Sequence, residues 1–179
     1  MQSSFKKLRY FIDNIDSLIL KLLSKRIRIS KKIQSLKPSP MKFSPAREKE
    51  ILKNCPREAL DVYLSILAVS RSWPADAKWF FIPGENAESD KLAMQYFRKI
   101  FGADIKIIEA AAPEEIAETA QKASENKPLF VICPGRSKPF GRAEDLFFKH
   151  AGYKKGGRKL FDFYSTAAPA EEKSVTINL

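Results

Sequence analysis

A single arginine interrupts the apolar stripe of the N-terminal segment. The apolar residues of this stripe recur at steps of three and four, as on one face of a helix: Leu8, Ile12, Ile15, Ile19, Leu22, Ile29, Ile33 and Leu36. The repeat would be unbroken if position 26 were apolar, but the residue there is Arg26. A guanidinium buried in such a stripe costs several kcal/mol unless an anion pairs with it. The pattern therefore indicates either a site for a bound carboxylate, which a guanidinium holds bidentately, or an arginine whose head reaches water at a helix–helix seam.

Two further cations can be placed relative to Arg26 by helical geometry. Lys37 lies on the same face, because eleven residues at 100° each turn the helix to within about 20° of the starting direction. Arg9 lies about 100° off that face and about 25 Å away along the axis. Arg9 and Arg26 therefore cannot share a site on one straight helix, but they could share one across a dimer.

The elements that must position these residues begin with one long helix. The stripe predicts a helix from about residue 4 to residue 37, roughly 50 Å long at 1.5 Å per residue. That length exceeds the diameter of a small domain, so the helix must pack along a partner. A second copy of the chain is the simplest partner, and we predict a homodimer.

A second and a third helix are predicted to follow. Ser44 is a good N-cap for the second, with Pro45 at the first helical position and Glu48 near the first turn. Taken alone, Arg47 and Glu48 are typical of an ordinary solvated helix start. Residues 60–70 carry the apolar spacing of the third helix.

Taken in order, these residues match the motifs of a known family. The matching segments are Leu8-Arg9-x-x-Ile12-Asp13-x-x-Asp16, Leu22-Leu23-x-x-Arg26, Ile33-x-x-x-Lys37 and Ser44-Pro45-x-Arg47-Glu48. The chain resembles the all-helical (AroQ-type) chorismate mutase family over about residues 5–74. The family's third helix ends in Ser-Arg-x-x-Gln, which appears here as Ser70-Arg71-Ser72-Trp73-Pro74.

The resemblance implies an activity. Family members are intertwined helical dimers that convert chorismate to prephenate, in the shikimate pathway toward phenylalanine and tyrosine. This pericyclic isomerisation needs no nucleophile, metal or cofactor. It needs a dicarboxylate held in a compact conformation and a cation beside the breaking ether bond, which is positioning and electrostatic stabilisation.

The resemblance also implies roles for three cations of the first helix. Arg9, supplied by the partner subunit, would hold one carboxylate of the substrate. Arg26 would hold the other carboxylate, and Lys37 would reach the ether oxygen.

The remaining implied site residues lie along the three helices. Glu48 would accept the substrate hydroxyl, with Arg47 beside it. Ile33 would line the pocket and Ser70 would approach a carboxylate. Ser44 stands where the family often has aspartate.

One position departs from the family pattern. The family places glutamine or glutamate four residues after the serine, where its side chain hydrogen-bonds the ether oxygen, and this chain has Pro74 there. Loss of one such donor costs roughly 3–4 kcal/mol in comparable sites. The expected function is therefore a chorismate mutase, slowed by Pro74. The alternative is a non-catalytic protein that kept the fold and binds chorismate or prephenate, or regulates another enzyme.

The chain is expected to divide near Pro74, which should end the third helix. The predicted fold class is an all-α chorismate-mutase-like domain, residues 1–74, followed by a small α/β domain, residues 75–179. The strands predicted in the second domain are 79–82, 105–108 and 129–133, with edge strands at 159–164 and 175–179, and the predicted helices are 89–101, 113–124 and 143–150.

Residues 78–134 weakly resemble the start of a prephenate dehydratase domain. The segment Pro83-Gly84-Glu85-Asn86 stands where that domain has a Gly-Pro-Glu-Gly loop, and a helix with Tyr96 and Phe97 follows at matching spacing. The Thr-Arg-Phe catalytic motif and the amino-acid-sensing domain are missing. We therefore predict no dehydratase activity, and an unrelated α/β module is the alternative interpretation.

Composition and charge narrow the possible partners. Residues 1–55 carry 14 Lys and Arg against 4 Asp and Glu, whereas the other 124 residues carry 18 against 17. The basic residues in 136–159 alternate with aromatic ones, as in single-strand binders, but a solvated basic surface is commoner and nucleic acid is not predicted. Two cysteines and one histidine do not make a zinc site, so no metal is predicted, and the resemblance implies that no cofactor is needed. With no membrane span or secretion signal expected, we predict a cytoplasmic protein.

Overall fold

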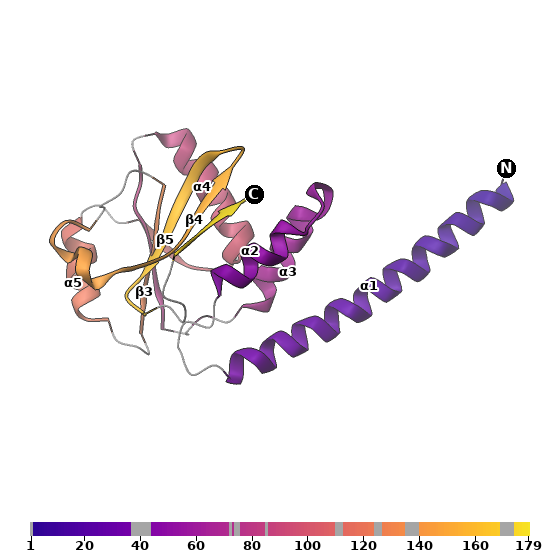
Figure 1. Cartoon of the computed structure of the whole chain (residues 1–179), viewed down its shortest axis with the longest axis horizontal. Helices are drawn as coiled ribbons and strands as arrows, with labels where there is room; N and C mark the ends of the chain where they lie inside the picture. Colours follow the sequence, from indigo (N-terminus) through magenta and orange to yellow (C-terminus); the bar gives the residue numbers. More distant parts are fainter. Residues whose placement is uncertain are drawn as a thin grey trace. The chain divides into compact units, whose positions relative to one another are not determined.

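The computed structural model describes residues 2–36, 44–71, 73, 76–84, 86–109, 113–123, 127–134, 140–168 and 174–179. The chain forms two compact units, Met1–Leu36 and Lys37–Leu179. The first is a single helix, and the second combines helices with a six-stranded sheet (Figure 1).

Helix α1 (Gln2–Leu36) makes up the first unit and confirms the predicted long helix. Within the chain, the eight apolar residues of its stripe are between 48% and 75% exposed. An amphipathic helix gains most of its stability by burying such a stripe. Helix α1 therefore leaves its apolar stripe largely exposed within the chain.

The second unit is built on one mixed sheet with the strand order β2-β1-β3-β5-β4-β6. The strands are β1 (Lys78–Phe81), β2 (Ile107–Glu109), β3 (Leu129–Cys133), β4 (Phe148–Lys155), β5 (Arg158–Ser165) and β6 (Val175–Asn178). Strand β1 pairs in parallel with β2 and β3, and β5 runs antiparallel to both β3 and β4. The alternation of side chains along each strand gives the sheet two buried faces.

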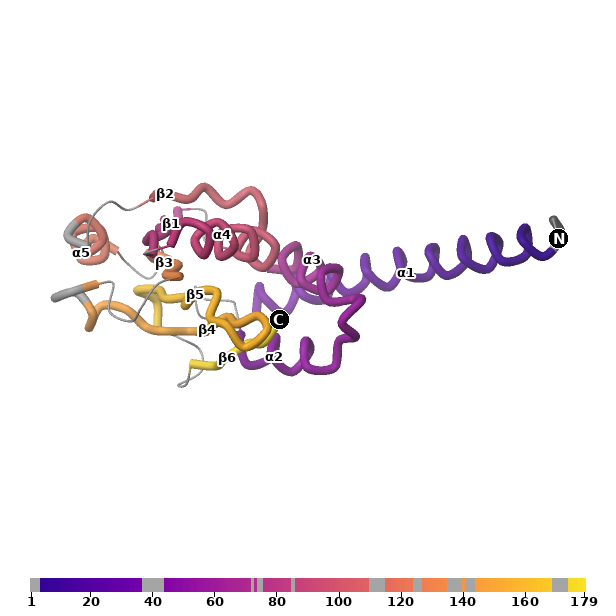
Figure 2. The backbone as a smooth tube through the Cα atoms, turned by 90° about the horizontal axis from the view of Figure 1, so that it is seen from above, coloured from indigo at the N-terminus to yellow at the C-terminus, as the bar shows by residue number. Residues whose placement is uncertain are grey.

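Helices cover both faces of this sheet (Figure 2). On one face, α4 (Ala87–Phe101) packs Phe97 and Phe101 against Trp79 and Phe163. On the other, α5 (Pro113–Gln121) packs Ile116 and Ala120 into a smaller cluster around Phe80, and α5 also contacts the 3₁₀ helix η2 (Gly141–Leu146). The predicted helical N-terminal region followed by an α/β region is confirmed at this level.

Two short helices complete the α4 side of the core. Helix α2 (Pro45–Lys53) contacts β6, and α3 (Leu60–Ser70) contacts α4, with the 3₁₀ turn η1 (Arg57–Ala59) between them. Leu52, Leu64 and Leu67 are buried in the same cluster as the sheet aromatics. Helices α2 and α3 thus share one compact unit with the sheet, whereas the division at residue 74 stays a prediction about domain organisation.

The helix predicted at residues 143–150 is wrong. Residues 141–146 form η2, and β4 begins at Phe148. Strand β4 was not predicted, and β5 is an interior strand instead of the expected edge strand, because β4 lies between it and β6. Pairing with β5 buries His150 to Tyr153 of β4, and this tertiary context overrides the local helix preference.

Candidate functional site

Ser44 fixes where α2 begins. Its side-chain oxygen accepts a hydrogen bond from the backbone N–H of Arg47 at 3.3 Å, and its carbonyl accepts one from Glu48 at 3.1 Å. Pro45 occupies the first turn, where its missing N–H costs nothing. The predicted N-cap is confirmed. By fixing the first turn of α2, it places Arg47 and Glu48 at successive positions around the helix, so their side chains point in different directions.

Arg47 lies on the surface of α2. Its side chain is 69% exposed, and Nη1 donates to Oε2 of Glu50 at 2.7 Å. Arg47 also borders a shallow depression lined by Glu50, Ile51 and Asn54. Arg47 therefore stands next to Glu48 in the chain, as the resemblance implies, with its side chain exposed and paired to Glu50.

The Glu48 side chain, unlike that of Arg47, is directed into the interior of the second unit. Its side chain is 10% exposed, and its partner is Arg71, the first residue after α3, whose side chain is 5% exposed. Arg71 Nε donates to Glu48 Oε1 at 2.9 Å, and Arg71 Nη2 donates to Glu48 Oε2. The two groups form a buried bidentate ion pair, a geometry in which arginine fixes the plane of a carboxylate.

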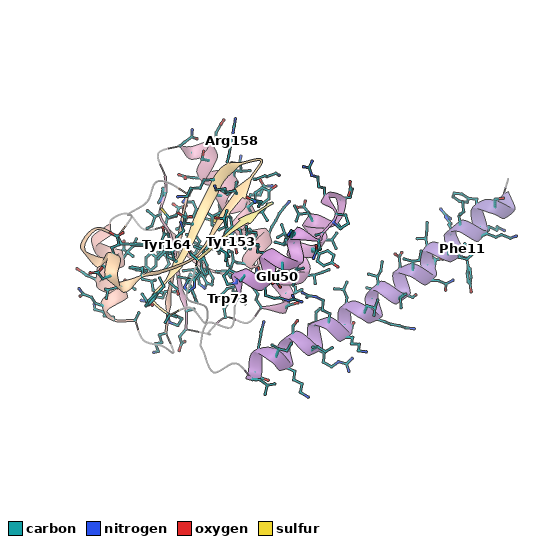
Figure 3. The ribbon with its side chains drawn as sticks, viewed as in Figure 1. Phe11, Glu50, Trp73, Tyr153, Arg158 and Tyr164 are labelled. Atoms are coloured by element: carbon teal, nitrogen blue, oxygen red, sulfur yellow. The ribbon has the colours of Figure 1, made fainter. Side chains whose placement is uncertain are left out.

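Aromatic side chains of the core lie on one side of this ion pair. Arg71 Cζ lies 5.0 Å from the ring centroid of Phe101 on α4, and that ring meets Tyr153 of β4 edge-on at 5.8 Å. Tyr153, which Figure 3 labels, is fully buried, and its hydroxyl has no hydrogen-bond partner among the described residues. Burial raises the pKa of Tyr153 well above its ordinary value, and the charge of Glu48 raises it further while Arg71 opposes both. The electrostatic influence of both charges reaches the strand.

Ser70 lies one residue before Arg71 and is buried. Its hydroxyl donates to the carbonyl of Ile66 at 2.6 Å, a bond one turn back within α3. The end of α3 therefore presents Ser70 and Arg71 in sequence, with Arg71 directed at Glu48. Pro74, the position that departs from the family pattern, lies outside the described residues.

The cations of α1 lie in the other unit. Arg9 is exposed, with its Cζ 4.8 Å from the ring centroid of Phe5, and Arg26 is half-buried. Ile33 is 51% exposed. Lys37 lies outside the described residues. The structure thus gathers Ser44, Arg47, Glu48 and Ser70 in one unit, and it describes the predicted residues of α1 separately.

Sequence reasoning missed that Arg71 is the partner of Glu48. Arg71 is part of the Ser70-Arg71 motif, but 23 residues separate it from Glu48, and no spacing rule joins the two. Phe101 and Tyr153 were also missed, because they reach the pair from elements on the far side of residue 74. The sequence signal that could have pointed to Arg71 is a charged residue directly after the apolar helix α3.

Two negative findings apply to the described parts of the chain. No three His, Cys, Asp or Glu side chains gather there as the ligands of a metal ion would. None of the helices there has the length and apolarity needed to cross a bilayer.

Comparison with known proteins identifies the family. A sequence model of the family described as chorismate mutase type II matches residues 8–107, more than half of the chain. The matched region runs from the first turns of α1 through α2, α3 and α4 to the start of β2. No curated protein and no solved structure matches the chain. The sequence match, together with the cationic and acidic residues at the expected spacing, shows that the chain belongs to the chorismate mutase type II family.

Proposed function

We propose that this protein is a chorismate mutase, which rearranges chorismate to prephenate in aromatic amino acid biosynthesis. The observation that carries the proposal is the family match over residues 8–107, which includes the charged residues of α1 and α2. The reaction is unimolecular, so the site has to hold a dianionic substrate in a compact conformation and stabilise the charge that develops on the ether oxygen.

The proposed site draws its cations from α1. Arg26 in the apolar stripe would hold one substrate carboxylate, and Arg9 of a second copy would hold the other. Lys37 would donate to the ether oxygen. The exposed stripe of α1 supports the dimer that this arrangement requires. Its eight apolar side chains are about half exposed or more, and burying them against a second helix would stabilise the pair.

Helices α2 and α3 would supply the rest of the site. Glu48 would accept the substrate hydroxyl, because an ionised carboxylate offers about four lone-pair positions and Arg71 uses two of them. Arg47, Ser44 and Ser70 would border the substrate, and Ile33 of α1 would line the pocket. Pro74 offers no side-chain donor, so we expect turnover to be slow relative to a site with glutamine there.

The test is chorismate disappearance, followed by ultraviolet absorbance, with the purified full chain and the variant Arg26→Ala. Arg28→Ala is the matched control, because it removes the same charge from nearly the opposite face of α1. We expect turnover in the wild type and in Arg28→Ala, and a loss of about 10²-fold or more in Arg26→Ala.

Other outcomes separate the alternatives. If the wild type shows no turnover but chorismate raises its melting temperature, the protein is a binding or regulatory relative. If there is neither turnover nor binding, the site assignment is wrong and only family membership remains.

A further inference from the structure

The ion pair between Glu48 and Arg71 holds the Glu48 carboxylate by both of its oxygens. Both oxygens are bound, one to Nε at 2.9 Å and one to Nη2, so rotation of the carboxylate about its own axis breaks both bonds. Both side chains are at least nine-tenths buried, which excludes most competing water. A fixed carboxylate plane is what recognition of a single hydroxyl requires.

Arg71 has two further contacts of its own. Its backbone N–H donates to the carbonyl of Ala68 at 3.2 Å, and its guanidinium lies over the ring of Phe101. Phe101 is fixed in turn against Tyr153, and both rings are at most 1% exposed. The α/β core therefore determines where the guanidinium lies, and through it the orientation of Glu48.

We propose that Arg71 is the positioning residue of the mutase site: it holds the Glu48 carboxylate in the orientation that receives the substrate hydroxyl, and the α/β core supports it through Phe101 and Tyr153. The inference rests on the proposed function and adds to it a residue and a role for the α/β core. Arg71 acts through Glu48 and does not touch the substrate.

The experiment measures kcat and KM for chorismate in the full chain with Arg71→Met, Arg71→Lys, Glu48→Gln and the double variant Glu48→Gln with Arg71→Met. We expect Arg71→Met to lower kcat by roughly 10²-fold with a much smaller change in KM, as misplacement of a catalytic group does. Arg71→Lys keeps the charge but cannot bind both oxygens, so its kcat should lie between those of Arg71→Met and the wild type. The double variant should be no slower than Glu48→Gln alone, because the two residues act as one unit.

Lys99→Met is the matched control. It breaks an ion pair that also joins two helices of the same unit, Lys99 Nζ to Asp61 Oδ2 at 3.0 Å, but this pair is 36% and 66% exposed and lies outside the proposed site. We expect its kcat to stay within about twofold of the wild type. The double variant and Arg71→Lys keep the test decisive if Arg71→Met fails to fold, because neither leaves an unpaired buried carboxylate.

Two results would overturn the inference while leaving the mutase intact. In the first, the wild type turns over and folded Arg71→Met or Arg71→Lys matches it in kcat. In the second, the losses from Glu48→Gln and Arg71→Met multiply in the double variant, as independent sites do. If the wild type itself shows no turnover, the proposed function fails first and Arg71 loses its role with it.

Discussion

Arg47 and Glu48 are adjacent in the chain, yet their charges lie in different surroundings. The Arg47–Glu50 pair is about two-thirds exposed, and such pairs contribute about 0–1 kcal/mol to stability. Breaking a buried pair such as Glu48–Arg71 costs about 3–5 kcal/mol, because one charge is left without its partner. A substitution at Glu48 is therefore expected to lower the free energy of unfolding, so kinetic data on such a variant need a measurement of stability beside them.

A second buried group makes stability depend on pH. His150 is 2% exposed, and its Nε2 lies 2.7 Å from Ser165 Oγ. Burial lowers the pKa of His150 from 6.5 to about 4, although a backbone hydrogen bond with Ala167 acts to raise it. Between these values the unfolded chain binds a proton that the folded chain does not. The neutral His150 therefore makes its full contribution to the free energy of unfolding above pH 6.5. This contribution is lost as the pH falls toward 4, by about 3 kcal/mol in all.

Urea unfolding between pH 7.5 and 5 checks this expectation, with His150→Gln as the control, since glutamine does not titrate. His150 is the only histidine in the chain, so the slope above about pH 5 belongs mainly to it. The variant should lose that slope. A wild-type stability that stays level from pH 7.5 to 5 would contradict the buried neutral imidazole.

At the same scale, the sequence predicts some site residues better than others. Arg26 stands out because it interrupts a periodic stripe, and Ser44 because a cap followed by proline has a local physical cause. Arg71 does not stand out, because its contact with Glu48 depends on how α2 and α3 fold onto the sheet. Spacing and capping patterns identify residues whose role depends on their neighbours in the chain. They do not identify residues whose role depends on a tertiary contact.

The elements show the same limit. Strand β3 and residues 79–81 of β1 are predictable from the sequence because they are continuous apolar runs, buried on both faces. Strand β4 has lysines at its ends and histidine, alanine and glycine in its middle, so nothing local distinguishes it from a helix. A Cβ at Gly152 would lie 2.9 Å from Oδ1 of Asp162 on the neighbouring strand, so a larger residue there would have to displace that carboxylate. Only the pairing with β5 makes that constraint visible.

Helices α2 and α3 lead to a prediction about fragments. They bury Leu52, Leu64 and Leu67 in the core of the sheet, and a fully buried leucine contributes about 1.5–3 kcal/mol. Three of them amount to much of the 5–15 kcal/mol typical of a whole domain. We expect a fragment of residues 44–179 to unfold cooperatively in urea, and a fragment of residues 75–179 to lose that transition.

Near-ultraviolet circular dichroism follows the transition well, because both tryptophans, Trp73 and Trp79, belong to the aromatic core and Trp79 is common to the two fragments. Residues 75–179 alone could unfold cooperatively, with a free energy of unfolding within about 1 kcal/mol of that of the longer fragment. In that case α2 and α3 contribute little to the stability of this core. That result would favour the domain division near residue 74.

At the scale of the whole molecule, α1 combines an exposed apolar stripe with an excess of positive charge. Residues 2–36 contain 9 Lys and Arg against 2 Asp and Glu. Two such helices side by side attract each other through the stripe and repel each other through their charge. Because salt screens charge but leaves apolar burial intact, a dimer formed through α1 should tighten as ionic strength rises from 0.05 to 0.5 M.

A dianionic substrate would act in the same direction as salt. If Arg26 of one copy and Arg9 of the other bind its two carboxylates, the substrate binds the dimer and not the monomer, so chorismate must strengthen the association by linkage. Sedimentation velocity of the full chain at micromolar concentration, with and without chorismate, measures both effects. Ile19→Glu, in the middle of the stripe, should produce monomers, whereas Ser17→Glu adds the same charge on nearly the opposite face and should leave the dimer in place.

The two variants also distinguish the ways in which this expectation can fail. A wild type that is monomeric at every salt concentration would show that the α1 stripe is covered by something other than a second copy. A dimer that survives Ile19→Glu would place the interface away from the stripe, and Arg9 of the partner could then not be assumed to reach the substrate bound by Arg26. A dimer that Ile19→Glu breaks and chorismate does not strengthen would keep α1 as the interface but remove the substrate from it. The salt series, the substrate and the paired variants together test whether α1 forms a dimer interface and whether the substrate binds at that interface.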